Sequence, residues 1–139
     1  MACTLGIDHG SKRIGLAVSD PGGKVALPAG TLESQGFERD LAAIRRVVET
    51  RQVERIVVGL PIHMDGRFGS QAEAAREFAE RLARELGLPV DTLDERWTTR
   101  EAERALQATG RKGKKKRAVI DSVAAAILLR TYLEREGGG

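Results

Sequence analysis

Polar and apolar positions in the first third of the chain follow the two-residue period that is typical of β-strands. The pattern predicts strands over Thr4 to Asp8, Arg13 to Ser19 and Lys24 to Leu32, separated by turn signals such as Asp20-Pro21-Gly22-Gly23. Because the connections are short, we expect the three strands to form an antiparallel meander. Pro28 lies inside the third run, which predicts an edge strand or a bulge there.

The period changes to that of a helix after this meander. Apolar residues at helical spacing predict one helix from about Phe37 to Arg51 and a second that ends at Gly87-Leu88-Pro89. Ser70 and Glu73 form a capping-box pattern that predicts the start of the second helix. Between the two helices, Arg55 to Leu60 is a short β-rich run, typical of a central strand that is buried on both faces.

The last third of the chain adds one strand and two helices. Val90 to Leu93 is the expected fifth strand, and the capping box of Thr98 with Glu101 opens a short helix to about Gln107. A final apolar helix is expected from about Ala118 to Glu134. Antiparallel strands followed by alternating strands and helices predict an α/β fold, with one five-stranded mixed sheet and helices on both faces. Residues 1–139 are expected to form a single domain.

Acidic residues stand where several of these elements begin or end. Asp8 ends the first strand, Asp94 and Glu95 follow the fifth, and Asp121 lies in the first turns of the apolar last helix. Burying lone carboxylates costs several kcal/mol each, and mutual repulsion adds to that cost. A divalent cation would relieve both. An oxygen-only ligand set selects Mg²⁺ or Mn²⁺, and two such ions about 4 Å apart could support phosphodiester cleavage.

Each of these acidic residues also has a purely structural explanation. Asp8 can begin a turn by accepting hydrogen bonds from nearby amides. Asp94 or Glu95 can favour the amino terminus of the helix that follows. Asp121 can cap the last helix or pair with a basic residue. The combination of acidic residues therefore predicts a metal centre more strongly than any one of them does.

Charge is distributed unevenly along the chain. Lys and Arg number 23 against 20 Asp and Glu, a net charge of only +3, yet RKGKKKR concentrates six basic residues in seven positions. Such a run predicts contact with a polyanion, and a solvated linker is the alternative. Six phosphate contacts on a duplex would give a log–log salt slope of about −5 and would read no bases. The predicted phosphate-binding residues are Arg111, Lys112, Lys114, Lys115, Lys116 and Arg117.

Other candidate nucleic-acid contacts lie near the predicted acidic site. Lys12 and Arg13 are expected either to meet a phosphate or to be solvated at a hairpin tip. The long loop 61–69 is expected to line the substrate groove, with Arg67 as a phosphate contact. His63 in that loop is expected to be a surface histidine rather than a proton carrier. Trp97 either stacks on an unpaired base or belongs to the core.

Cysteine content and hydropathy restrict the cellular setting. Cys3 is the only cysteine, which excludes a disulfide framework and favours a reducing cytoplasm. No apolar stretch is long enough to span a membrane, and the amino terminus lacks the pattern of a signal peptide. We therefore expect a cytoplasmic protein that makes no membrane contact.

Four motifs that cover essentially the whole chain resemble those of the YqgF/RuvX family: GIDHGSKRIGLAVSD, VVGLPIHMDGRFGSQ, LDERWTT and VIDSVAAAILL. The resemblance implies a ribonuclease H-like fold in which Asp8, Glu95 and Asp121 form the catalytic metal site. It also implies a Mg²⁺- or Mn²⁺-dependent nuclease that processes the 5′ end of pre-16S ribosomal RNA. In related folds a fourth-strand acid serves the metal, whereas this chain has Gly59-Leu60-Pro61 there, so Glu95 is expected to take that role.

Other functions stay open at this point. Branched DNA is an alternative substrate to structured RNA, as for a Holliday junction resolvase. A non-catalytic nucleic-acid-binding module could share the same fold. An actin-like or sugar-kinase-like ATP site is disfavoured, because the chain is too short for the second lobe that such sites use and carries no adenosine-binding glycine motif.

Overall fold

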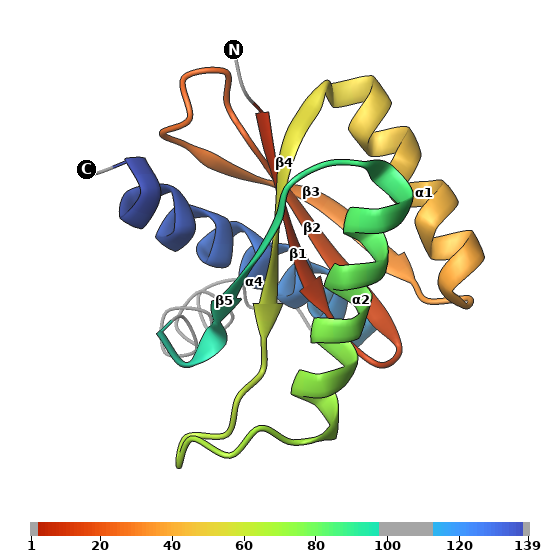
Figure 1. Ribbon diagram of the computed structural model, residues 1–139, viewed down its shortest axis with the longest axis vertical. Coiled ribbons are helices and arrows are strands. Elements are labelled where there is room, and N and C mark those ends of the chain that lie inside the picture. The colour runs from red at the N-terminus through yellow and green to blue at the C-terminus, as the bar shows by residue number, and fades with distance from the viewer. Residues whose placement is uncertain (1–2, 98–112, 138–139) are drawn as a thin grey trace.

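The computed structural model describes residues 3–97 and 113–137, with the side chains of 3–96 and 120–136. Five strands, a 3-10 turn and three helices make up these ranges (Figure 1). No helix within them is long and apolar enough to cross a membrane. In chain order the elements are β1 (Cys3–His9), β2 (Arg13–Ser19), β3 (Ala26–Glu33), α1 (Phe37–Arg51), β4 (Val53–Leu60), α2 (Ser70–Leu86), β5 (Val90–Asp94), η1 (Glu95–Trp97) and α4 (Gly113–Gly137).

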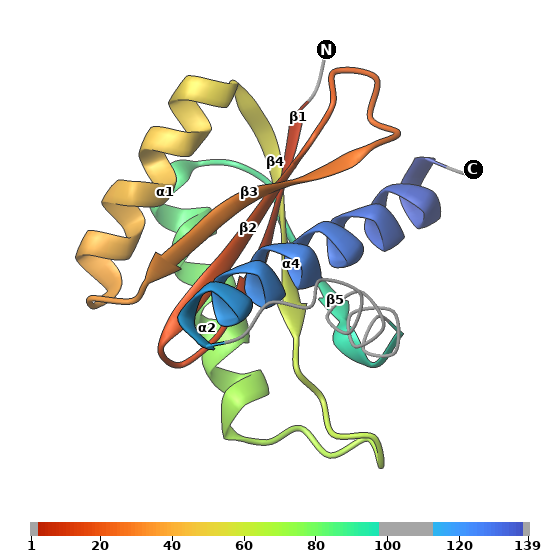
Figure 2. The same cartoon turned by 180° about the vertical axis from the view of Figure 1, so that it is seen from behind.

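The five strands form one mixed sheet in the order β3-β2-β1-β4-β5. β1, β2 and β3 pair antiparallel as the predicted meander, whereas β4 runs parallel to β1 and β5 parallel to β4. Helices α1 and α2 cover one face of the sheet, and α4 crosses the other face (Figures 1 and 2). The predicted five-stranded mixed sheet with helices on both faces is therefore confirmed.

Side-chain alternation divides the core into two layers. Successive residues of a strand point to opposite faces of the sheet, so β1 sends Leu5 and Ile7 toward α1 and α2 and turns Gly6 toward α4. The first layer includes Leu5, Ile7, Ile14, Ile44, Ile56, Val58, Phe78 and Leu82. The second layer includes Ala17, Val57, Leu93, Ala125, Leu128, Leu129 and Tyr132.

Two glycines allow α4 to lie directly on the sheet. A Cβ atom at Gly6 would come within 2.9 Å of the Leu129 Cβ, and one at Gly15 within 2.0 Å of the Asp121 carbonyl oxygen. Both distances are shorter than atoms tolerate, so any larger residue would push the helix away from β1 and β2. This close contact sets the height of α4 above the sheet and thereby positions Asp121.

The structure corrects the predicted boundaries of two elements. The last helix begins at Gly113 rather than at Ala118, so Lys114 to Arg117 belong to its first turns and not to a linker. Lys and Arg are good helix formers, and the prediction from the apolar pattern alone overlooked this preference. Strand β3 runs from Ala26 to Glu33, and its register shifts opposite Leu16 and Ala17, as the prediction of an edge strand or bulge at Pro28 requires.

The predicted capping box at the start of α2 is wrong. Gly69 is the N-cap residue, no side chain caps the helix, and Ser70 is already helical. The Glu73 side chain forms an ion pair with Arg76 instead of reaching back to the helix start. The predicted helix from Thr98 to Gln107 lies outside the described residues.

Candidate active site

The carboxyl ends of β1, β4 and β5 meet at one edge of the sheet. Asp8 lies near the end of β1, where it pairs with Gly15 of β2. Glu95 directly follows β5, and Gly59 lies near the end of β4 opposite Leu93. These strands run parallel, so their carboxyl ends come together although they are far apart in sequence.

Glu95 reaches Asp8 across β4 because position 59 carries no side chain. A Cβ atom at Gly59 would lie 2.3 Å from the Glu95 Oε1 and 2.8 Å from its Cγ and Cδ. The carboxyl group of Glu95 thus lies over the strand at Gly59 and forms a side-chain hydrogen bond with Asp8. Related folds carry an acidic residue on the fourth strand, where this chain has Gly59. This glycine leaves the space that the Glu95 side chain occupies.

The two carboxyl groups share a proton. Burial is the largest cause that raises the pKa of Glu95 to about 10, and the hydrogen bond and negative charge of Asp8 contribute to the same rise, with a smaller contribution from Asp94. Burial also raises the pKa of Asp8, although the bond from Glu95 opposes that rise and the charge of Asp121 adds to it. Near neutral pH, Glu95 therefore keeps its proton and donates it to the Asp8 carboxylate.

Asp121, in α4, forms an ion pair with Arg13 of β2. The Arg13 Nε donates to Asp121 Oδ2 at 2.7 Å, and the Asp121 side chain is only 16% exposed. Asp121 therefore pairs with a basic residue, as one structural alternative proposed, but the partner comes from β2. Arg13 is only 33% exposed, so it is not a solvated residue at a hairpin tip.

The ligand chemistry of these three acids fits a hard divalent cation. All their donors are carboxylate oxygens, the ligands that Mg²⁺ and Mn²⁺ prefer. Among residues 3–97 and 113–137, no three His, Cys, Asp or Glu side chains lie in an arrangement that would hold an ion as they stand. In this arrangement Glu95 bonds to Asp8, and Arg13 forms an ion pair with Asp121. The catalytic role of the three acids stays a prediction.

Asp94 has a structural role. It accepts hydrogen bonds from the Arg96 backbone N–H at 2.9 Å and from the Arg96 Nε at 2.8 Å, and it forms an ion pair with the same guanidinium. These bonds fix the start of η1, next to Glu95. This confirms the structural alternative for Asp94, that it stabilises the start of the helical turn that follows it.

His9 packs on α2 and does not join the carboxylates. Its ring stacks on Phe78 with the centroids 4.4 Å apart, and Phe37 meets Phe78 edge-on at 5.9 Å. Burial lowers the pKa of His9, so the ring is neutral near pH 7. The sequence signal for this contact was available, because the residue after Asp8 in a strand must point to the opposite face of the sheet.

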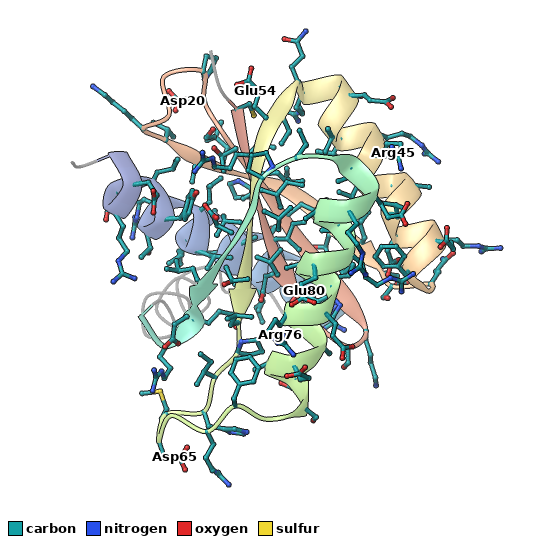
Figure 3. All side chains as sticks on the ribbon, in the orientation of Figure 1. Asp20, Arg45, Glu54, Asp65, Arg76 and Glu80 are labelled. Atoms are coloured by element: carbon teal, nitrogen blue, oxygen red, sulfur yellow. The ribbon has the colours of Figure 1, made fainter. Side chains whose placement is uncertain are left out.

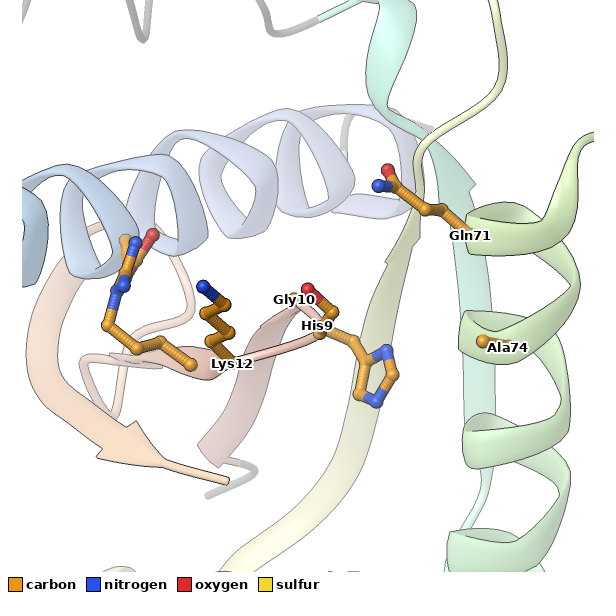
Figure 4. A pocket seen from close by; sticks show the side chains of 8 residues that line it. His9, Gly10, Lys12, Gln71 and Ala74 are labelled. Carbon is orange, nitrogen blue, oxygen red and sulfur yellow. The ribbon is translucent and has the colours of Figure 1, made fainter. Parts of the chain in front are cut away.

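A cavity of about 270 Å³ opens beside Asp121, between the turn that joins β1 to β2 and the first turns of α2 (Figure 4). His9, Lys12, Arg13, Gln71 and Asp121 line it. Gln71 was not singled out from the sequence, and no local pattern marks it. It reaches this place only because α2 packs beside the end of β1.

The loop between β4 and α2 projects from the body of the protein, with Asp65 near its tip (Figure 3). Arg67 is 74% exposed and forms an ion pair with Asp65 at 2.7 Å. Met64 and Phe68 are also exposed, by 76% and 45%. His63 is exposed, which confirms the prediction of a surface histidine. The phosphate contact of Arg67 stays a prediction.

The remaining predicted contacts lie partly outside the described residues. Trp97 ends η1 next to the acidic site, and its side chain is not described. Lys114, Lys115, Lys116 and Arg117 belong to the first turns of α4. Arg111 and Lys112 lie outside the described ranges. Their contact with nucleic acid stays a prediction.

Two solved structures that superpose over nearly the whole chain are those of resolvases. The Thermus thermophilus RuvC solved in complex with a Holliday junction substrate superposes with a TM-score of 0.63 at 18% identity, covering 99% of this chain and 97% of that one. The fowlpox virus resolvase solved with Holliday junction DNA has a TM-score of 0.56 at 12% identity, covering 96% and 98%. At these identities the likeness shows the fold, and it confirms the predicted ribonuclease H-like architecture.

Sequence relatives are much closer. The "Putative pre-16S rRNA nuclease" of Moorella thermoacetica is 46% identical over 133 residues, which cover 96% of this chain and 95% of that protein. The protein of the same name from Anaeromyxobacter dehalogenans is 46% identical over 132 residues, covering 95% and 96%. The family model described as "RuvX: Holliday junction resolvase" matches residues 2–135. The chain therefore belongs to the RuvX family.

Proposed function

We propose that this protein is a metal-dependent nuclease and that residues 1–139 form one catalytic domain. The observation that carries the proposal is the buried contact between Asp8 and Glu95, next to Asp121. A proton shared by two buried acids near a third is costly unless the site has a use for them. Perturbed carboxyl groups of this kind cluster at functional sites, and the relatives named as rRNA nucleases support the same reading.

Asp8, Glu95 and Asp121 are the residues that would hold Mg²⁺ or Mn²⁺. Such an ion supplies Lewis-acid activation for hydrolysis of a phosphodiester. The chain itself contributes the rest of the chemistry. Glu95 would have to release its proton to water for all three carboxyl groups to serve as anionic ligands. Arg13 exchanges Asp121 for a substrate phosphate, because a guanidinium binds both kinds of oxygen pair.

The substrate that we propose is structured RNA, specifically the 5′ end of pre-16S ribosomal RNA, with activity in the cytoplasm. The names of the close relatives support this substrate. The basic residues of 111–117 would then bind the phosphate backbone together with Lys12 and Arg67, and Trp97, at the end of η1, would stack on an unpaired base. Branched DNA is the second candidate substrate, because the family model is described as a Holliday junction resolvase.

Cleavage assays with two matched variants test the proposal. Wild type, Glu95→Gln and Glu54→Gln are incubated with a pre-16S RNA fragment or a four-way DNA junction, with Mg²⁺ or with EDTA. Glu54 is an exposed residue at the opposite end of β4, so its variant makes the same chemical change away from the site. We expect Glu95→Gln to lose at least about 100-fold in rate and Glu54→Gln to match wild type.

Two outcomes would overturn the proposal. Equal cleavage by wild type and Asp8→Asn in EDTA would show that the acidic site does not perform the reaction. Binding that is insensitive to metal, with no turnover of either substrate, would identify a nucleic-acid-binding module instead.

A further inference from the structure

The cavity beside Asp121 has one aromatic wall that is held rigidly. His9 borders both this cavity and a second one of about 210 Å³, which Phe37 of α1 also lines. Phe78, which is almost fully buried, stacks on the ring and fixes its orientation. Phe37 supports Phe78 edge-on, and the Arg81 guanidinium lies 3.6 Å above the Phe37 ring. The imidazole is thus a supported platform rather than a freely rotating side chain.

Polar and cationic groups line the rest of the cavity. Gln71 extends from the first turn of α2 and Lys12 from the turn between β1 and β2, and both line the cavity that His9 also borders (Figure 4). The Gln71 amide offers two donors and one acceptor carbonyl. Lys12 offers an ammonium group, and Arg13 borders the cavity on the side of Asp121.

These groups match the three parts of a nucleotide. A flat aromatic ring suits base stacking, an amide suits the hydrogen-bonding edge of a base, and an ammonium group suits a phosphate. The volume of about 270 Å³ lies just below the range for small-ligand sites, which begins at roughly 300 Å³. Such a space suits one nucleotide and is too small for a base pair with its sugars.

We propose that this cavity binds a single unpaired nucleotide next to the phosphate that is cleaved, with its base stacked on His9 and its edge bonded to Gln71. This inference rests on the proposed nuclease function and narrows the substrate to one with an unpaired nucleotide beside the cleavage site. The cavity touches Asp121, so a base within it would bring the adjoining phosphate to the acidic site. Lys12 would hold the phosphate on the outer side of that nucleotide.

The test uses binding in EDTA, so that cleavage is not required. Duplex RNAs that carry one 2-aminopurine, either unpaired in a one-nucleotide bulge or fully paired, are titrated with wild type, His9→Ala, His9→Phe and Gln71→Ala. Stacking quenches the fluorescence of 2-aminopurine. Gln35→Ala is the matched control for Gln71→Ala, since Gln35 is exposed and lies outside the cavity.

We expect wild type to quench the unpaired probe and to prefer the bulged RNA over the paired one. His9→Ala should lose quenching and weaken bulge binding about 5- to 100-fold, and His9→Phe should restore both, because every base can stack on an aromatic face. Gln71→Ala should weaken bulge binding with quenching retained, whereas Gln35→Ala should behave as wild type. Recovery in His9→Phe also shows that loss in His9→Ala does not come from unfolding.

The outcomes separate this inference from the nuclease proposal. Equal affinity of wild type for bulged and paired RNA, with no quenching, would overturn the nucleotide site even if the protein cleaves RNA with Mg²⁺. Quenching that depends on His9 in a protein that cleaves neither substrate would support the nucleotide site and overturn the nuclease proposal.

Discussion

A Cβ atom at Gly15 would lie only 2.0 Å from the carbonyl oxygen of Asp121. Gly15 pairs with Asp8 across the first hairpin, so the same residue brings both α4 and β1 to the site. The distance between Asp8 of β1 and Asp121 of α4 therefore depends on the absence of a side chain at Gly15.

Replacing this glycine should separate the acids. We expect Gly15→Ala to lower the free energy of unfolding by about 3 kcal/mol, because the clash is with backbone atoms that cannot rotate away. Nuclease activity should fall in the same variant, since α4 carries Asp121. Urea unfolding followed by circular dichroism measures the stability. Gly22→Ala is the control, because its new Cβ would meet only the Asp20 carboxylate, a side-chain group rather than backbone, at 3.1 Å; equal stability of the two variants would contradict the close-packing argument.

The shared proton predicts how stability depends on pH without metal. The pKa of Glu95 rises from an ordinary 4.5 to about 10 on folding, so between these values the folded chain binds more protons than the unfolded chain. The free energy of unfolding must then fall as pH rises through this window, by up to about 1.4 kcal/mol per pH unit for one proton. Thermal unfolding in EDTA from pH 5 to pH 9 should show this decline.

Glu95→Gln and added Mg²⁺ provide the controls for that prediction. The glutamine keeps a donor toward Asp8 and cannot ionise, so its unfolding temperature should change less between pH 5 and pH 9. Mg²⁺ needs deprotonated ligands, so it should raise the unfolding temperature of wild type more at pH 9 than at pH 5. A wild-type profile that rises with pH in EDTA would contradict the shared proton.

The ion pair between Arg13 and Asp121 predicts competition with a metal ion. Arg13→Gln releases Asp121, and loss of a partly exposed pair worth about 1 kcal/mol should tighten Mn²⁺ binding about fivefold in the absence of nucleic acid. Calorimetric titration with Mn²⁺ measures the affinity. Arg67→Gln breaks an ion pair of the same length in the exposed loop and should leave the affinity unchanged. Weaker Mn²⁺ binding by Arg13→Gln would show that Arg13 assists the metal site instead.

A polar cluster at the opposite end of the sheet fastens α4 to the strands. The Tyr132 hydroxyl donates to Asp91, and the Arg55 Nη1 donates to the same hydroxyl at 3.0 Å. We expect Tyr132→Phe to lower the free energy of unfolding by about 1–2 kcal/mol, because a partly buried bond to Asp91 is lost and Arg55 loses a partner. Thr131→Val should cost less, since that hydroxyl donates to the Ile127 carbonyl of its own helix. Denaturant unfolding measures the stability of both variants. Equal losses of unfolding free energy would show that the Tyr132 hydroxyl contributes no more than that of Thr131.

The basic start of α4 predicts a salt dependence. If its four cationic residues all contact phosphates, neutralising them should reduce the slope of log affinity against log salt by about 3.6 on a duplex. Fluorescence anisotropy at several salt concentrations measures the slope for Lys114→Gln, Lys115→Gln, Lys116→Gln and Arg117→Gln combined. The control neutralises four exposed arginines of α1 and α2, namely Arg45, Arg46, Arg51 and Arg84. An equal reduction of the salt slope in both variants would mean that the basic start of α4 contacts the phosphates no more than other exposed arginines do.

Some features of the site could be predicted from local sequence alone. The spacing of hydrophobic residues predicted the five strands and the two core helices α1 and α2, because burial and backbone sterics act over a few neighbouring residues. The same alternation implies that Gly6 and Asp8 share one face while Leu5, Ile7 and His9 share the other. The start of α4 escaped prediction, because its first turns are basic rather than apolar, and the Gly69 cap of α2 left no side-chain signature.

The sequence by itself therefore determined the elements, the faces of the strands and which acids stand at strand ends. Only the tertiary structure decided that Glu95 shares its proton with Asp8 across Gly59, and that Asp121 pairs with Arg13, a residue 108 positions away. It also placed Gln71 and His9 on one cavity. The physical reason is that these contacts depend on how closely α4 and β5 approach β1, and that distance is set by missing side chains at Gly15 and Gly59, which leave no periodic signal in the sequence.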